Sequence, residues 1–221
     1  MNLLVRILKW VLALFVGSTM LAVVAYRYIP VYVTPLMIIR AINPQGTEKQ
    51  QQRERHWKHH WVPLDEISSW MPKAVVASED GHFYSHHGFD FEAISKAVEE
   101  KRAGKRERGA STITQQTAKN VFLWPGHSWM RKGLEAYFTV LIEIFWSKDR
   151  IMEVYLNSIE MGAGIYGVSA AADHYFSTAP SRLTKRQCAL IAVTLPSPLK
   201  RDPAHPSPYL RKRATQIMRY M

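Results

Sequence analysis

An acidic pair, Glu79–Asp80, stands where the apolar stretch AVVAS (74–78) meets a glycine turn. A carboxyl group that emerges from an apolar wall is partly desolvated, and desolvation raises its pKa toward neutral pH. Such a group can remove a proton from a hydroxyl as a general base. The alternative is structural, because acidic residues at this place also cap the next helix. Within this window both interpretations stay open.

The turn after the acidic pair is rich in histidine and aromatic residues. His82 and His86 are four positions apart, a spacing that could hold a metal ion if the segment were helical. No third ligand is evident nearby, and Phe83, Tyr84 and Phe89 are typical of packing. The pattern therefore favours a packed scaffold over a metal site.

A second chemically suggestive stretch is STITQQTAKN (111–120), which predicts a helix with Ser111 as its N-cap. Its start follows Arg106 and Arg108, and Lys119 comes two turns later. Cations around a helix N-terminus are suited to a pyrophosphate. The alternative is a solvent-facing stripe, although such stripes usually carry more Glu and Lys. The polar face consists of Thr112, Gln115, Gln116, Lys119 and Asn120.

A third stretch begins a helix that is almost wholly apolar further on. Arg131, Lys132 and Glu135 fall within its first turns, at spacings that bring their side chains together. As an exposed ion pair this arrangement is worth about 0.2–0.5 kcal/mol. At the edge of a cleft it would supply two cations and a second carboxylate. Glu143, within the apolar part, has no role that the sequence indicates.

These stretches belong to a chain whose apolar spacing is mainly helical. No run of alternating strands and no internal repeat occurs, so we expect a mostly α fold with one compact domain. A proline-rich loop separates the last two helices. The predicted helices cover residues 65–79, 90–104, 111–122, 131–146, 148–160, 167–176, 184–195 and 209–220.

The amino-terminal region predicts a membrane anchor. The run WVLALFVGSTMLAVVAY (10–26) carries no charge, and with its apolar flanks it can span ~30 Å of hydrocarbon. Arg6 and Lys9 precede it, which favours a cytoplasmic tail (1–9), a transmembrane anchor (10–29) and an exported body. A cleaved signal peptide is the alternative, but no small-x-small site follows. Residues 30–60, polar and basic, are predicted to be a membrane-proximal linker.

The charge of the chain favours an anionic partner. Lys and Arg number 29 against 18 Asp and Glu, a formal net charge of +11. For an exported body, lipid phosphates are a better partner than nucleic acid. The single cysteine, Cys188, lies in an apolar run and is predicted to be a small buried hydrophobe.

Taken together and in order, five segments resemble the motifs of the family-51 glycosyltransferases, in particular the monofunctional peptidoglycan transglycosylases. The resemblance covers residues 61–221. The segments are EDGHFYSHHGFDF (79–91), RGASTITQQTAKN (108–120), RKGLEAY (131–137), RIMEVYLN (150–157) with GAGIYGVSAAADHYF (162–176), and ALIAVTLPSPLK (189–200).

The resemblance implies a lysozyme-like, two-lobed, mostly α glycosyltransferase domain (61–221) that polymerises lipid II at the outer face of the bacterial inner membrane. Glu79 would be the base that deprotonates the acceptor's 4-hydroxyl, with inversion at the donor and release of undecaprenyl pyrophosphate. Glu135 would be the second catalytic carboxylate, near the pyrophosphate. We expect Glu79 and Glu135 to line one cleft. Substrate-binding roles are implied for Asp80, Ser111, Thr112, Gln115, Gln116, Lys119, Asn120, Arg131 and Lys132.

The resemblance also implies the ligands and partners. A divalent cation such as Mg²⁺ or Mn²⁺ would reach Glu135 through the pyrophosphate, and no organic cofactor is expected. Partners would be lipid II, a lipid-linked glycan strand, the inner membrane and other cell-wall synthesis proteins, with no nucleic acid. Either Lys200 or Arg201 would supply the cation of the last motif.

Two other functions remain as alternatives. Paired carboxylates also serve glycosidases, so a lysozyme-like hydrolase that cuts glycan is the nearest enzymatic one. The amide-rich, cationic helix 111–120 argues against it, because a hydrolase has no pyrophosphate to hold. A membrane-anchored adaptor with a basic surface is the non-catalytic alternative.

Overall fold

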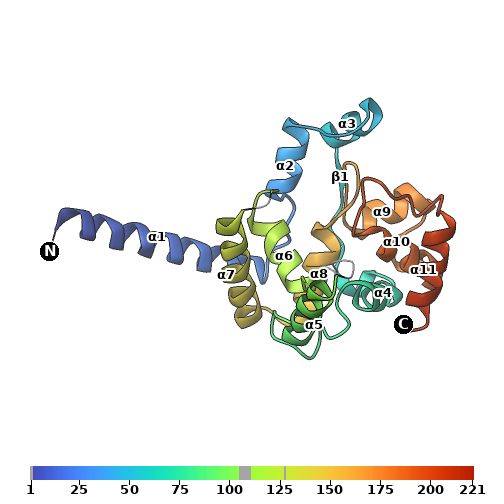
Figure 1. The fold of residues 1–221 in the computed structure, drawn as a ribbon. Helices are drawn as coiled ribbons and strands as arrows, with labels where there is room; N and C mark the ends of the chain where they lie inside the picture. Colours follow the sequence, from blue (N-terminus) through green and yellow to red (C-terminus); the bar gives the residue numbers. More distant parts are fainter. Residues whose placement is uncertain (1, 105–110, 127) are drawn as a thin grey trace.

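The computed structural model describes residues 2–104, 111–126 and 128–221, and it is mainly helical, which confirms the predicted class. Figure 1 shows α1 projecting from one end of a packed body and α11 at the opposite end. The helices are α1 (Leu3–Tyr26), α2 (Pro35–Ile42), α3 (Glu48–Arg55), α4 (Trp70–Glu79), α5 (Phe91–Arg102), α6 (Ile113–Phe122), α7 (Trp129–Phe145), α8 (Lys148–Ser158), α9 (Gly167–Phe176), α10 (Lys185–Thr194) and α11 (Pro208–Met218).

The first helix has the length and composition to cross a membrane, and most of its surface is exposed. It begins at Leu3, so most of the predicted tail (1–9) is helical too. Its far end is held against the body. The indole Nε1 of Trp146 donates to the carbonyl of Val23 at 2.7 Å, and Arg150 donates to the carbonyl of Tyr26 at 2.8 Å. The end of α1 is therefore fixed to the body near α7 and α8.

The segment 30–60, expected to be a linker, is largely folded. Thr34 caps α2, whose first residue is proline, and Thr47 forms a capping box with Gln50 at the start of α3. Glu54 on α3 is fully buried and accepts a hydrogen bond from the backbone of Gln45. The polar composition of the segment obscured these two short helices, which the caps define.

A small sheet, which the sequence analysis did not predict, joins this segment to the domain. It consists of β1 (Lys58–His59), β3 (Ile165–Tyr166) and β2 (Glu160–Gly162), in that order. β3 pairs with β1 in parallel and with β2 in antiparallel orientation. The strands have two or three residues, which is too short for an alternating pattern to show. The pairing of β2 with β3 nevertheless fixes the position of Glu160, the first residue of β2, relative to the domain.

Two groups of helices form the core. α6 packs against α7 and α8, and α10 packs between α4 and α11. Phe122 of α6 stacks on Phe138 of α7 with ring centroids 4.5 Å apart. Cys188 on α10 is buried, as predicted. The two groups are joined where Asp80, directly after α4, accepts from the backbone of Ile113 at the start of α6 at 2.9 Å, which fixes α4 relative to α6 and α7, the helices that carry the candidate site.

The starts of α4 and α6 differ from the prediction in an instructive way. Residues 64–66 form a separate 3₁₀ turn (Leu64–Glu66), so α4 begins at Trp70 rather than near Asp65. The N-cap of α6 is Thr112 rather than Ser111, because the Thr112 hydroxyl accepts from the backbone of Gln115 and the Gln115 side chain accepts in return from the backbone of Thr112.

Candidate active site

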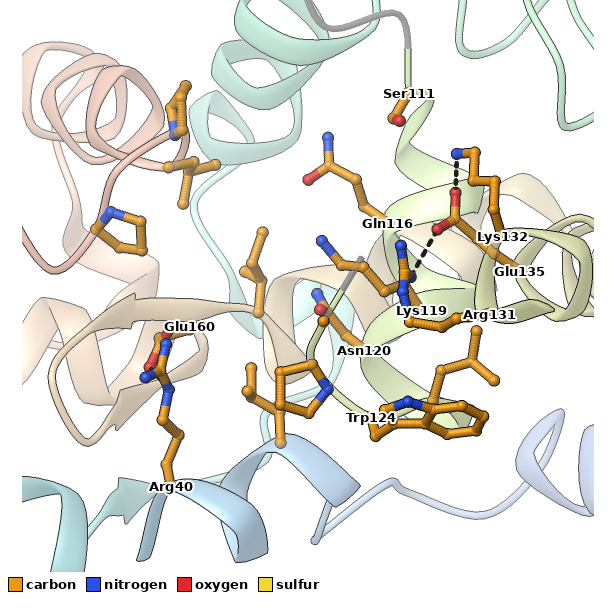
Figure 2. Close-up of a pocket in the computed structure, with 18 residues that line it drawn as sticks. Arg40, Ser111, Gln116, Lys119, Asn120, Trp124, Arg131, Lys132, Glu135 and Glu160 are labelled. Atoms are coloured by element: carbon orange, nitrogen blue, oxygen red, sulfur yellow. Dashed lines mark hydrogen bonds and ion pairs between the residues drawn. The ribbon is translucent and has the colours of Figure 1, made fainter. Parts of the chain in front are cut away.

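A cavity of about 600 Å³ opens between α2, α6, α7, β2 and the loop after α10. Figure 2 shows its lining, with Glu135 between two cations on one side and Arg40 beside Glu160 on the other. Cationic, amide and carboxylate side chains therefore meet in one place. The polar lining residues are Arg40, Ser111, Gln116, Lys119, Asn120, Arg131, Lys132, Glu135 and Glu160.

One side of the cavity carries three cations, Lys119, Arg131 and Lys132, which we call the cationic wall. Glu135 is the buried centre of this wall. Its side chain is 4% exposed, and its two oxygens accept separately from Arg131 Nη1, at 3.0 Å, and from the ammonium of Lys132. The sequence predicted this grouping from the spacing on α7. Arg131 is also buried, and its Nε has no hydrogen-bond partner in the described residues. One buried donor of the wall is thus left without a partner.

Lys119 extends the same wall from α6. Burial lowers the pKa of this ammonium, the carboxylate of Glu135 raises it, and the charges of Arg131 and Lys132 lower it again. No hydrogen bond or ion pair joins the side-chain ammonium of Lys119 to any other part of the chain that the structure describes. Three cations thus converge with one carboxylate between them, so the wall has a surplus of positive charge for an anion.

Glu79 is the last residue of α4 and is partly buried. Its Oε1 accepts from the hydroxyl of Ser78 at 3.1 Å, and its Oε2 accepts from Nε2 of Gln116 at 3.2 Å. Burial raises the pKa of Glu79. The hydrogen bonds from Gln116 and Ser78, followed by the charges of Arg201 and Arg213, oppose that rise. The carboxyl group is therefore partly desolvated, as the sequence predicted, and it accepts two hydrogen bonds.

The expected single cleft is only partly found. Glu135 lies on the cavity wall, whereas Glu79 adjoins that wall through Gln116, the residue that contacts it. Gln116 and Lys119 are three residues apart on α6, so one helix face joins the neighbourhoods of the two carboxylates.

Three predicted substrate-binding residues make their contacts within the packed structure. Asp80 is 7% exposed, contacts Nε2 of His86 at 2.9 Å and accepts from the backbone of Ile113 at 2.9 Å. Thr112 and Gln115 are consumed by the capping box at the start of α6. None of the three lines the cavity. Their polar groups are used to hold α4, α6 and the intervening turn together.

The histidines of this turn have carboxylate partners. His82 Nδ1 lies 2.9 Å from Asp90, the residue that caps α5, and His86 lies against Asp80. Within the described residues no group of three or more His, Cys, Asp or Glu side chains is arranged to hold a metal ion. The turn thus supports the end of α4.

The donor set around Glu135 does not fit a resident divalent ion. Both carboxylate oxygens already accept from cationic groups, and Lys119 adds a further positive charge. A metal at Glu135 would have to displace the ammonium of Lys132 from the carboxylate. No step of the reaction is therefore assigned to a protein-bound metal.

The sequence analysis missed a second polar cluster on the opposite wall. Arg40 Nε lies 3.6 Å from Oε1 of Glu160, and Tyr166 lies behind the same oxygen at 3.5 Å. Burial raises the pKa of Glu160 to about 7, with Arg40 lowering it and Glu54 raising it. Arg40 and Glu54 come from the segment expected to be a linker. The only available signal was the charge of Glu160 between apolar neighbours.

The structure also distinguishes Lys200 from Arg201. Arg201 donates from Nη1 to the carbonyl of Val193 at 2.7 Å, and its charge acts on Glu79. Lys200 is exposed and does not contribute to the pKa of Glu79. Arg201 is therefore the cation of the last motif that faces the candidate base. Arg106 and Arg108, proposed as part of the pyrophosphate site, lie outside the described residues.

Comparison with known proteins agrees with this arrangement. A family model described as Transglycosylase matches residues 45–221, which begins within the folded segment before β1. A "Biosynthetic peptidoglycan transglycosylase" from Bacteroides thetaiotaomicron is 57% identical over 216 residues, covering 98% of this chain and 86% of the relative. One of the same name from Caulobacter vibrioides is 53% identical over 209 residues, covering 93% and 87%. The chain belongs to the transglycosylase family.

Proposed function

We propose that this chain is a peptidoglycan glycosyltransferase that polymerises lipid II into β-1,4-linked glycan strands. One lipid-linked saccharide supplies an acceptor hydroxyl, and the other is the donor and loses undecaprenyl pyrophosphate. The single observation that carries the proposal is the position of Gln116 between Glu79 and Lys119. Gln116 donates to the half-buried carboxyl of Glu79, and three residues later on α6 Lys119 belongs to the cationic wall of the cavity.

The chemistry follows from these positions. Glu79 takes the proton of the acceptor's 4-hydroxyl, and its raised pKa suits it to hold that proton. The oxygen attacks the donor's anomeric carbon from the face opposite the leaving group, so the configuration inverts. The new C–O bond forms as the bond to the pyrophosphate oxygen breaks, and the electron pair leaves with the diphosphate.

The cationic wall stabilises the departing diphosphate. Glu135 holds Arg131 and Lys132 before the reaction starts, and the partly buried Lys119 lies on the same wall; charge that develops beside cations already in place costs little reorganisation. Glu135 holds Arg131 and Lys132 in place through its two oxygens. Its role in this proposal is to orient these two cations toward the donor phosphates. Ser111, Gln116 and Asn120 offer neutral hydrogen-bonding groups to the sugars along the same wall.

The anchor places both substrates within reach. α1 would cross the bacterial inner membrane once, with its amino terminus in the cytoplasm and the catalytic domain in the periplasm, because Arg6 and Lys9 precede the apolar run. The undecaprenyl tails of donor and acceptor would then lie in the same bilayer. A divalent cation such as Mg²⁺ or Mn²⁺ would arrive with the pyrophosphate and neutralise part of its charge. Other cell-wall synthesis proteins remain expected partners.

The proposal is tested by incubating the full-length protein in detergent with purified lipid II. We expect glycan polymer and free undecaprenyl pyrophosphate, and the polymer should be degraded by a muramidase that cuts β-1,4 bonds. Glycan strands isolated from cell walls serve as the second substrate. Release of soluble muropeptides from them, with no polymer formed from lipid II, would identify a hydrolase instead. Inactivity on both substrates would favour the non-catalytic adaptor.

A further inference from the structure

A second hollow, of about 400 Å³, opens beside the candidate active site, between α3, α9 and the loop 198–205. Pro198 lines both this hollow and the active-site cavity, so the two adjoin. We call this second hollow the basic basin. Its charged and histidine lining residues are Lys49, Arg53, His174, Lys200, Arg201, Asp202 and His205.

The charges of the basic basin are not balanced. Asp202 is the carboxylate on its wall, and it is engaged by its own turn, accepting from the backbone of Ala204 at 2.8 Å and contacting His205 at 3.1 Å. In the described part of the chain, no ion pair joins Lys49, Arg53 or Lys200 to an acidic residue. The basin therefore has a surplus of cations that can bind an anion.

The basin is also held in shape by contacts across it. Gln50 Nε2 donates to the carbonyl of Leu199 at 3.1 Å, which joins α3 to the loop. The carbonyl of Arg53 lies against Gly164, whose φ of +66° and lack of a Cβ permit the close approach. Arg201 is tied to α10 through the carbonyl of Val193. Lys49, Arg53, Lys200 and Arg201 are thus carried by segments that contact one another, and these contacts hold the basin in shape.

The position of the basin favours an anion other than a lipid headgroup. In Figure 1, α9 and α10 lie in the half of the body away from α1, while α7 lies next to it. If α1 spans the bilayer, the basin faces away from the lipid surface. It adjoins the active-site cavity at Pro198. Its ligand is then a group that branches from the bound saccharide.

We infer that the basic basin binds the carboxylates of the short acidic peptide that the substrate's muramic acid residue carries. This inference rests on the proposed function, since it takes lipid II as the substrate. The peptide presents several carboxylates at the end of a flexible link to the sugar ring, and a guanidinium such as Arg53 can bind a carboxylate through two parallel hydrogen bonds. The basin would thereby select saccharides with an intact, charged peptide.

Binding is tested first, because it does not need catalysis. The full-length protein is titrated with a soluble, lipid-free disaccharide peptide by calorimetry. The double variant Arg53→Gln/Lys200→Gln should weaken binding by about 10-fold or more, because two charge-assisted contacts are lost. The control Lys212→Gln removes an exposed cation of α11 outside the basin and should bind as the unaltered protein does. Equal affinity in the double variant would overturn the inference.

The same titration distinguishes the source of the anion. A disaccharide peptide with all carboxylates amidated should bind the unaltered protein as weakly as the charged probe binds the double variant. If the amidated probe bound as well as the charged one, the peptide would not be the ligand. Competition by phosphatidylglycerol vesicles that is lost in the double variant would assign the basin to lipid headgroups and overturn the inference.

A kinetic measurement connects the basin with the proposed reaction. With ordinary lipid II, Arg53→Gln/Lys200→Gln should raise KM by about 10-fold and leave kcat within about 2-fold, since a contact made equally in ground and transition states alters binding alone. With peptide-amidated lipid II, variant and unaltered protein should have the same KM. An equal rise in KM on both substrates would contradict the inference. Absence of polymer with the unaltered protein would instead refute the proposed function, while the titration would still report on the basin.

Discussion

The side-chain amide of Gln116 donates from Nε2 to Oε2 of Glu79 at 3.2 Å. The other end of the amide accepts from the hydroxyl of Tyr155 at 3.2 Å, and Tyr155 is fully buried. The amide is thus held from the core side, with its donor end facing the carboxyl. Because Gln116 also lines the active-site cavity, it is the point where the candidate base meets the substrate pocket.

This hydrogen bond predicts a change in pH dependence. A bond to the charged form of a carboxyl lowers its pKa, so removing it in Gln116→Met should raise the pKa of Glu79 further above its ordinary value. The acidic limb of the pH profile of kcat/KM should move to higher pH. Gln52→Met, at an exposed position of α3 outside the cavity, is the control. An acidic limb that stays in place or moves to lower pH would contradict the assignment of Glu79 as the titrating base.

Asp80 is expected to act on stability rather than on chemistry. Its buried carboxylate contacts His86 and accepts from the backbone of Ile113, so Asp80→Asn should lower the free energy of unfolding by about 1–3 kcal/mol. Thermal unfolding measures this, with the exposed Asp65→Asn as the control. The polymerisation rate per folded molecule should change by less than about 10-fold. A much larger loss of rate without loss of stability would show that Asp80 contacts the substrate.

The raised pKa of Glu160 predicts that the stability of the protein depends on pH. Its folded-state pKa of about 7 lies above the ordinary value of 4.5, so the folded state binds the extra proton. Stability should therefore fall as pH rises from about 4.5 to about 7, by at most about 3 kcal/mol from this group. Glu160→Gln cannot ionise and should be more stable than the unaltered protein above pH 7 but not near pH 5.

Thermal unfolding across this pH range measures the difference, with the exposed Glu99→Gln of α5 as the control. A difference between Glu160→Gln and the unaltered protein that did not grow with pH would contradict the raised pKa.

Lys119 should affect the chemical step more than substrate binding. The ammonium is one of three cations on the wall assigned to the leaving diphosphate, and the charge there grows as the bond breaks. Lys119→Met should lower kcat by about 100-fold and change KM much less. Steady-state rates with lipid II measure both constants, and Lys212→Met is the control. A rise in KM at constant kcat would mean that Lys119 only binds the ground state.

Much of this site was predictable because its residues are linked by helical spacing. Arg131, Lys132 and Glu135 are three and four residues apart on α7, and the structure joins them as predicted. The apolar stretch before Glu79 correctly indicated a desolvated carboxyl. What spacing could not show was which polar groups the fold uses for its own contacts. Asp80, Thr112 and Gln115 have suitable side chains, yet capping and packing consume them.

The missed residues came from contacts between distant segments. Arg40 lies 120 positions before Glu160, and it reaches the pocket because α2 folds over the cavity. The basin depends in the same way on α3 meeting the loop that contains Leu199. Neither of these long-range contacts produces a local pattern in the sequence. A composition that is polar and basic suggested a solvated linker for residues 30–60, whereas two capped helices and a parallel strand pairing attach it to the domain.

The most direct test of the account is the initial rate of polymer formation from lipid II by Glu79→Gln, measured beside Glu99→Gln and with thermal unfolding of both. Glutamine keeps the shape and the contact to Gln116 but cannot accept the acceptor's proton. We predict a rate at least ~100-fold below that of the unaltered protein, with the cooperative unfolding transition retained. A folded Glu79→Gln protein that polymerises at the ordinary rate would show that another group is the base.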